Sequence, residues 1–276
     1  LILLVPLLFI CQQLKSKSKQ NLAKIKGTVI ITGASSGIGK AFAKYFSKKY
    51  DLILVARREQ ELQQIKEDCG SERITVFPCD LQQVSEVDRL MDSLKEIKIG
   101  LFLNCAGITH KIPNQLLELD NDEVEKILNL HIQQTTKIIS KVNTIFQKQK
   151  HGVFVQMSSG LGITGSPFLS VYAASKAYQI NLVKSLNAES EAYGAQFVAA
   201  CPLWVSTPMT MTKKENLQFI GPKTFVHKFM ASTWKNVVNP YWFHRLIVCI
   251  LSINDKVTGR IQWSQQVVTR QKIITK

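Results

Sequence analysis

Tyr172 and Lys176 are the two residues whose types and spacing point most clearly to chemistry. They lie four residues apart in Tyr-Ala-Ala-Ser-Lys, within a long and mostly apolar stretch of helical periodicity. At this spacing both side chains project from one face of a helix. A neighbouring positive charge favours the phenolate and so lowers the pKa of a tyrosine. We therefore expect proton transfer to or from an alcohol oxygen here, although a packed Tyr beside a solvated Lys is a common alternative.

A glycine-rich turn at Thr32–Gly39 predicts the second half of such a site. It reads Thr-Gly-Ala-Ser-Ser-Gly-Ile-Gly, follows an apolar run and leads directly into a helical pattern. Glycines at this point allow a tight turn and let the backbone approach a pyrophosphate at the positive end of the helix. An ordinary strand-to-helix turn is the alternative. The expected cofactor-binding residues of the turn are Gly33, Ser35, Ser36, Gly37, Ile38 and Gly39.

The end of the second apolar run indicates which dinucleotide would bind. Folds that bind NAD usually carry an acidic residue about 20 residues beyond the glycines, where it accepts hydrogen bonds from the ribose hydroxyls. This chain has Ala56 and Arg57 there, and no carboxylate. A guanidinium suits a 2′-phosphate, so we expect NADP(H) bound by Arg57; a solvated loop charge is the alternative.

The elements that must position these residues alternate along the chain, which predicts an α/β fold. Short apolar runs separated by amphipathic stretches are typical of a doubly wound parallel sheet, Rossmann-type, with helices on both faces. The expected strands are Val29–Ile31, Leu52–Val55, Ile74–Phe77, Leu101–Leu103, Val153–Gln156 and Gln196–Ala200. The expected helices are Gly37–Lys49, Glu59–Asp68, Val84–Ile97, Asp122–Gln149 and Tyr172–Tyr193. We expect one domain over residues 27–276.

The ends of the chain are apolar and basic. Residues 1–10 are apolar but too few to span a bilayer, which takes about 20 residues, and lysines follow them. We interpret residues 1–26 as the remnant of a membrane anchor with a basic linker; an interfacial or cleaved anchor and a buried helix are the alternatives. Residues 206–235 are predicted to form a substrate lid and residues 236–276 a helical extension.

Composition excludes several classes of function. The formal net charge is +15, but no cluster of Lys and Arg is interleaved with aromatic residues, so nucleic-acid binding is not expected. The six cysteines show no metal-ligand spacing, and we expect no metal site. Scattered thiols indicate a reducing compartment.

Taken together, the ordered motifs resemble the short-chain dehydrogenase/reductase family, over about residues 27–210. Within it, Arg57, the apolar start, Ser158-Ser159-Gly160 and Val205–Met209 are most similar to the branch of 17β-hydroxysteroid dehydrogenases and very-long-chain 3-oxoacyl-CoA reductases. The resemblance implies an NADP-dependent oxidoreductase that transfers hydride to a ketone, with Tyr172 as general acid. It also implies a lipid-like substrate, either a 3-oxoacyl-CoA or a steroid-type ketone.

The resemblance also implies roles for individual residues. Ser159, thirteen residues before Tyr172, would bind the substrate carbonyl, with Ser158 ranked second. Asn129 would hold a water next to Lys176, which itself would bind the nicotinamide ribose. Cys105 stands where the family has a second Asn. The further residues expected along the cofactor are Asp80, Leu81, Asn104, Ala106, Gly107, Pro202, Val205 and Thr207.

Partners and location follow from the same likeness. We expect a membrane-associated protein whose catalytic domain faces a reducing compartment, at the endoplasmic reticulum or alternatively a mitochondrial membrane. The end, Lys272–Lys276, lacks the dilysine spacing of a retention signal. A homodimer and a subunit of a membrane complex both remain open. The alternative function is an accessory or structural subunit that keeps a cofactor-binding reductase fold without turnover.

Overall fold

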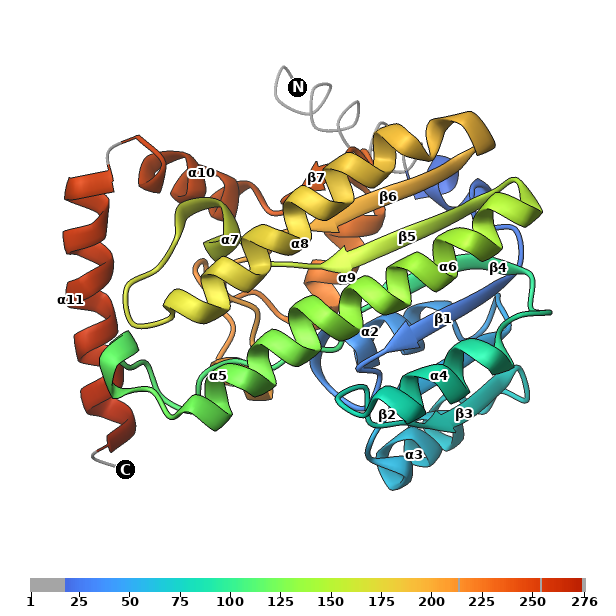
Figure 1. Ribbon diagram of the computed structural model, residues 1–276, viewed down its shortest axis with the longest axis horizontal. Helices are drawn as coiled ribbons and strands as arrows, with labels where there is room; N and C mark the ends of the chain where they lie inside the picture. Colours follow the sequence, from blue (N-terminus) through green and yellow to red (C-terminus); the bar gives the residue numbers. More distant parts are fainter. Residues whose placement is uncertain (1–17, 213, 254, 275–276) are drawn as a thin grey trace, which may run out of the picture.

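The computed structural model describes residues 18–212, 214–253 and 255–274, and its centre is a parallel seven-stranded sheet (Figure 1). The strand order is β3-β2-β1-β4-β5-β6-β7, as expected for a doubly wound sheet. The strands are β1 (Thr28–Thr32), β2 (Leu52–Ala56), β3 (Ile74–Pro78), β4 (Ile99–Asn104), β5 (Gly152–Met157), β6 (Ala195–Ala200) and β7 (Val237–Val238). The six predicted strands are confirmed. The sequence prediction lacked β7, which has only two residues and so no recognisable apolar run.

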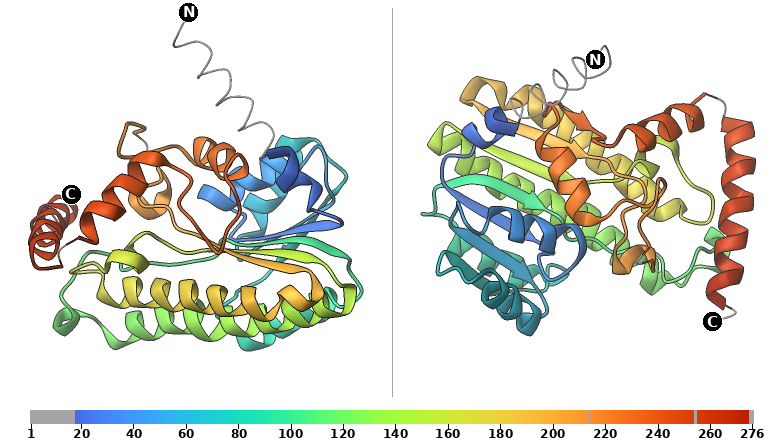
Figure 2. Two further views of the ribbon diagram at one scale, coloured as in Figure 1. Left: turned by 90° about the horizontal axis from the view of Figure 1, so that it is seen from above. Right: turned by 180° about the vertical axis from the view of Figure 1, so that it is seen from behind.

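Helices cover both faces of the sheet, as Figure 2 shows in the view from above. One face carries α2 (Gly37–Phe46), α3 (Glu59–Cys69) and α9 (Pro222–Met230). The other carries α4 (Val84–Ser93), α6 (Thr135–Gln149) and α8 (Ser170–Glu189). The strands read as continuous apolar runs because alternate residues, such as Ile30 and Ile31 of β1, enter opposite cores.

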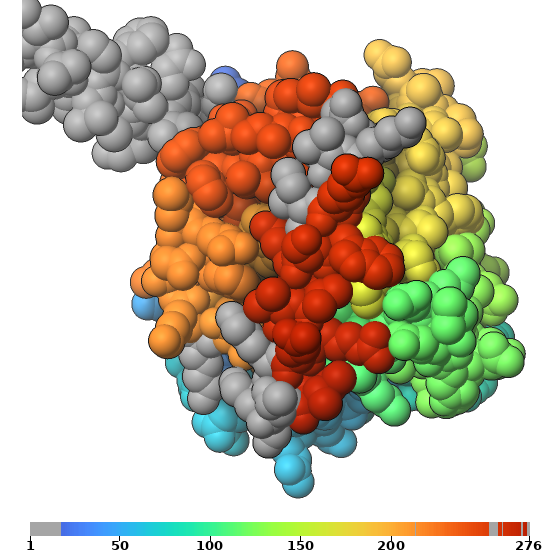
Figure 3. All heavy atoms as spheres, turned by 90° about the vertical axis from the view of Figure 1, so that its left-hand side faces the viewer, coloured from blue at the N-terminus to red at the C-terminus, as the bar shows by residue number. Residues whose placement is uncertain are grey.

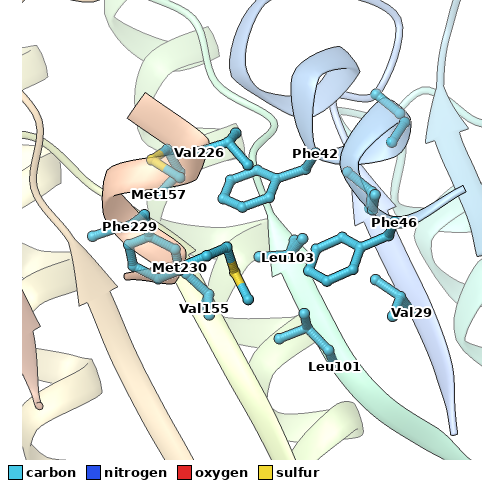
Figure 4. Close-up of a cluster of buried hydrophobic side chains, with 14 of the residues drawn as sticks. Val29, Phe42, Phe46, Leu101, Leu103, Val155, Met157, Val226, Phe229 and Met230 are labelled. Atoms are coloured by element: carbon cyan, nitrogen blue, oxygen red, sulfur yellow. The ribbon is translucent and has the colours of Figure 1, made fainter. Parts of the chain in front are cut away.

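Helix α9 corrects the predicted extent of the lid. Phe229 and Met230 are buried in the core against α2, and the Phe229 ring meets Phe42 edge-on at 5.8 Å between centroids (Figure 4). The apolar residues of α9 are therefore core residues, so this part of the predicted lid at residues 206–235 is wrong. For the other residues of the lid the role stays a prediction.

The long helix predicted for Asp122–Gln149 is interrupted. The chain forms α5 (Asn121–Leu128), a wider π-helical turn η2 (Asn129–Gln134) and then α6. Such a turn frequently marks a functional site. Sequence periodicity cannot reveal it, because one widened turn leaves the apolar pattern on either side intact.

Helices form the carboxyl-terminal extension, as predicted. After α7 (Leu161–Thr164) and α8, the chain adds α10 (Trp242–Leu251) and α11 (Asp255–Ile274). Helix α11 runs across one end of the molecule (Figure 3), with Trp263 packed on Phe168 and Arg270 paired with Glu118 at 2.8 Å. The remaining short helices are η1 (Leu116–Glu118), η3 (Glu191–Tyr193) and η4 (Pro208–Thr210).

The folded unit begins before the predicted boundary at residue 27. Asn21 and Ile25 are buried, and the Asn21 amide donates to the carbonyl oxygens of Met230 and Ser232. The predicted anchor at residues 1–10 lies outside the described residues. Among the described residues, no helix combines the length and apolarity needed to cross a membrane.

Candidate active site

A cleft at the carboxyl edge of the sheet brings together most of the predicted site residues. Parallel strands end there, where open α/β sheets bind ligands. Its lining includes the predicted residues Gly33, Ser35, Ser36, Gly37, Ile38, Gly39, Arg57, Asp80, Leu81, Ala106, Gly107, Ser159, Tyr172, Lys176, Pro202, Val205 and Thr207. Asn104 and Asn129 are not part of this lining.

The glycine-rich turn has the shape required to approach a phosphate group. Gly33 adopts a left-handed φ of +63°, and a Cβ there would meet the Ala106 nitrogen at 2.8 Å. Ser36 caps α2 without a side-chain hydrogen bond to the helix, so its first N–H groups remain directed at the cleft. The residues present therefore fit a dinucleotide pyrophosphate.

Asn104 lies behind this turn and connects three strands. Its Oδ1 accepts a 2.6 Å hydrogen bond from Thr32 Oγ1, and its Nδ2 donates to Gln156 Oε1 at 2.8 Å. Thr32 Oγ1 in turn accepts from the Ala106 nitrogen. Asn104 thus holds the carboxyl ends of β1, β4 and β5 in register next to the cleft, and does not reach a ligand itself.

Two arginines lie at the adenine end of the cleft. The sequence reading selected Arg57, which the structure leaves exposed on the cleft wall. It overlooked Arg58, whose Nη2 donates to Ser35 Oγ at 3.1 Å and whose Nη1 pairs with Glu61. The signal was the Arg-Arg doublet, but only the tertiary structure shows that Arg58 reaches back to the glycine-rich turn.

Ser159, Tyr172 and Lys176 meet at the other end of the cleft, and all three side chains are buried. Burial raises the pKa of Tyr172 to about 12, while a hydrogen bond with Ser159 acts in the opposite direction. This differs from the expected lowering by Lys176. The reason is geometric: Lys176 Nζ lies 5.6 Å from the centroid of the Tyr172 ring and donates its hydrogen bonds elsewhere.

The environment of Lys176 is unusual because it contains no carboxylate partner among the described residues. Nζ donates to the Met157 carbonyl at 3.0 Å and to Gln179 Oε1 at 3.1 Å. Burial lowers the pKa of Lys176 to about 7, against smaller opposing effects of Cys201 and Cys105. Ser158 bonds the Lys176 carbonyl oxygen, so it fixes α8 to β5 and leaves Ser159 as the serine nearer the phenol.

The structure does not bring Asn129 to Lys176. Its Nδ2 donates to the Gln82 carbonyl, and its Oδ1 accepts from Gln134. Two residues further on in the same π-helical turn, the His131 ring lies against Gly107 and close to Lys176. Sequence analysis did not single out His131, which lies among other polar residues in Asn129-Leu-His-Ile-Gln-Gln134.

His131 is neutral and held on both ring nitrogens. Ser175 Oγ donates to the Tyr172 carbonyl, so Nδ1 of His131 is the donor in its 2.9 Å contact with Ser175. Nε2 accepts from the Ile108 nitrogen at 3.1 Å. Burial holds the pKa of His131 well below its usual range. This ring therefore fixes the loop after β4 and does not carry protons.

The substrate end of the cleft is apolar. The lining includes Pro208 and Met209, which lie in the predicted lid, and also Met157 and Leu203, which the sequence did not predict to line the cleft. Met209 is also solvent-exposed. Leu203 and Met209 offer apolar surface to the cleft, which suits an aliphatic chain. The Met157 side chain belongs to the buried core (Figure 4), and its carbonyl oxygen accepts from Lys176.

Comparison with known proteins agrees with this geometry. A model of the family described as short chain dehydrogenase matches residues 27–218. The very-long-chain 3-oxoacyl-CoA reductase of Neurospora crassa is 30% identical over 244 residues, covering 82% of this chain and 74% of that protein. The protein of the same name from Anas platyrhynchos is 30% identical over 253 residues, covering 87% of this chain and 81% of that protein.

Solved structures resemble the fold. A 7beta-hydroxysteroid dehydrogenase superposes with a TM-score of 0.76 at 20% identity, over 87% of this chain and 98% of that one. A short-chain dehydrogenase from Sphingobium yanoikuyae in complex with NADPH gives 0.67 at 24% identity, over 74% and 83%. The family match extends from the glycine-rich turn past Tyr172 and Lys176. The chain therefore belongs to the short-chain dehydrogenase family of oxidoreductases, in the branch of the very-long-chain 3-oxoacyl-CoA reductases.

Proposed function

We propose that this protein reduces the 3-keto group of a long-chain 3-oxoacyl-CoA with NADPH. The observation that carries the proposal is the meeting of Ser159, Tyr172 and Lys176 at one end of a cleft whose other end is the glycine-rich turn. The names of the relatives from Neurospora crassa and Anas platyrhynchos support the acyl-CoA substrate. The apolar residues Leu203 and Met209 in the cleft lining support an aliphatic chain over a small polar ketone.

In this reaction, each residue of the site would have a separate role. The residues of the cleft would hold NADPH, which would supply the hydride when bound. The Ser159 and Tyr172 hydroxyls donate hydrogen bonds to the carbonyl oxygen, where negative charge develops during reduction. Tyr172 then transfers its proton to that oxygen as general acid. The Lys176 ammonium lies 5.6 Å from the centroid of the Tyr172 ring, and its charge would favour the phenolate left behind because both groups are shielded from water.

NADPH preference is proposed to depend on Arg57. Replacing Arg57 with Glu should raise the KM for NADPH about 10- to 100-fold and improve the relative use of NADH, because a carboxylate repels the 2′-phosphate and accepts ribose hydroxyls. Initial rates with each cofactor would measure the change. Arg73→Glu is the matched control, since Arg73 is exposed on the loop before β3 and outside the cleft. An unchanged cofactor ratio in Arg57→Glu would exclude this role.

The substrate is tested by comparing acyl and steroid ketones. Purified protein is assayed for NADPH oxidation with 3-oxoacyl-CoA of increasing chain length, and with a 17-ketosteroid. The proposal expects kcat/KM to rise with chain length, because each added methylene buries apolar surface worth about 0.8 kcal/mol. A higher kcat/KM for the steroid would overturn the acyl-CoA assignment and leave the reductase chemistry intact.

We also propose that the protein works at a membrane surface of the endoplasmic reticulum. Helix α10 supports this, because one of its faces exposes Trp242, Leu246 and Ile250 at helical spacing. Arg245 is also exposed on this helix and is suited to anionic headgroups. An interfacial helix would suit a substrate that is dissolved in a bilayer.

A further inference from the structure

Lys176 is held by a side chain that the proposed chemistry does not mention. Gln179 lies three residues after Lys176 on α8, so both side chains project from the same face of the helix. The side chain of Gln179 is fully buried, and its Oε1 accepts the hydrogen bond from Lys176 Nζ at 3.1 Å. A buried glutamine requires partners for both ends of its amide.

The other end of the Gln179 amide contacts the π-helical turn. Nε2 donates to the carbonyl oxygen of His131 at 3.0 Å. An ammonium only donates and a carbonyl only accepts, so the amide has a single orientation between them. Gln179 therefore bridges Lys176 on α8 and the backbone of η2, with both hydrogen bonds in the interior.

The His131 residue, whose carbonyl oxygen accepts from Gln179, is itself held in place. The His131 ring bonds Ser175 on α8 and the backbone of Ile108 after β4. The His131 ring also lies edge-on to the Tyr172 ring, with centroids 5.8 Å apart. The π-helical turn is thus attached to the helix of the catalytic pair and to the loop that borders the cleft.

We propose that Gln179 is the positioning residue for the catalytic lysine, tying Lys176 Nζ to the π-helical turn so that the ammonium stays beside Tyr172. The inference rests on the proposed function for the role of Lys176, but the contacts stand without it. An amide orients a cation and does not pass its proton on. Gln179 therefore fixes a charge, and it is no member of a proton-transfer chain.

The electrostatic consequence has a definite sign. The titratable groups facing Lys176 are Tyr172 on its own helix, Cys105 after β4, Cys201 after β6 and His131 in η2. None is a carboxylate. The dipole of the Gln179 carbonyl favours the charged form of Lys176 and so opposes the burial that lowers its pKa to about 7. Loss of this oxygen must lower that pKa further.

Two substitutions with opposite effects test the inference. Gln179→Leu retains the side-chain volume and removes the acceptor, whereas Gln179→Glu replaces the amide oxygen by a carboxylate. The pKa of Lys176 would be read without cofactor, by NMR titration of protein labelled with 13C-lysine and assigned with Lys176→Met. We expect a decrease of about one unit in Gln179→Leu and an increase of about one unit in Gln179→Glu.

Gln134→Leu is the matched control. Gln134 is also a buried glutamine in the π-helical turn, but its amide bonds Asn129 and not Lys176. It should leave the pKa of Lys176 unchanged. The midpoint of the pH profile of kcat/KM for NADPH-dependent ketone reduction should move down in Gln179→Leu and up in Gln179→Glu.

The outcomes separate the two proposals. Equal titration of Lys176 in wild type and Gln179→Leu would overturn the positioning role. If Gln179→Leu does not fold, the Gln179→Glu titration decides alone, and an unchanged pKa there overturns the role as well. The third outcome is that the pKa of Lys176 shifts in both Gln179 variants but the wild-type protein reduces no ketone. This result would refute the proposed function and keep the role of Gln179.

Discussion

Replacing Tyr172 with Phe should lower kcat for ketone reduction on the order of 10²–10⁴-fold, the usual contribution of a general acid. The phenol is buried and hydrogen-bonds Ser159, so the substitution removes the proton donor and leaves the ring packing in place. NADPH oxidation would measure kcat, and fluorescence titration would measure NADPH binding. We expect cofactor affinity to change little, because the hydroxyl acts on the substrate oxygen.

Tyr178→Phe is the control for this substitution. Tyr178 lies on the same helix, but its hydroxyl contacts Thr136 at the surface, 2.8 Å away and outside the cleft. Tyr178→Phe also removes a phenolic hydroxyl, but this hydroxyl does not face the substrate, so kcat should be unchanged. Equal rates for Tyr172→Phe and wild type would refute the mechanism.

The second large effect is expected at the cofactor end, where Gly33→Ala should weaken NADPH binding about 100-fold, or about 2.7 kcal/mol. A left-handed conformation costs a residue with a Cβ about 1–2 kcal/mol. In addition, this Cβ would lie 2.8 Å from the Ala106 nitrogen and 2.9 Å from its Cα. The two loops that border the cleft would have to separate. NADPH titration and chemical denaturation would measure the two effects.

Gly70→Ala separates backbone strain from the collision. Gly70 ends α3 with a similar φ of +53°, but nothing lies within 4 Å of its Cβ position. This variant should lose about 1–2 kcal/mol of stability from strain alone and bind NADPH normally. If both variants bound NADPH with wild-type affinity, the glycine-rich turn would have no role in holding the cofactor.

The shape of the glycine-rich turn and the pairing of Tyr172 with Lys176 could be predicted from sequence because each is a local pattern. Tyr172 and Lys176 share one helix face at any point of that helix, and glycines after an apolar run indicate a tight turn whatever surrounds them. The six longer strands were predictable for the same reason, since strands buried on both faces must be apolar throughout. All of these belong to segments of a few residues.

Contacts between distant segments could not be predicted. Residues 222–230 are equally compatible in sequence with a lid and with a core helix, and only packing on α2 decides for the core. The anchor expected at residues 1–10 stays a prediction, because these residues lie outside the described part of the structure. Arg58 could be assigned to the glycine-rich turn only once β1 and β2 were seen side by side.

The candidate active site shows the same difference between local patterns and distant contacts. The sequence by itself determined that Tyr172 and Lys176 share a helix face, because their relation depends on helix geometry alone. The tertiary structure decided that Lys176 bonds Gln179, which in turn bonds the π-helical turn. It also decided that the Asn129 side chain bonds Gln82 and Gln134. The physical reason is that burial and hydrogen-bond partners depend on where α5, α6 and α8 meet. One π-helical turn within a helix also redirects the side chains around it without changing the hydrophobic pattern of the sequence.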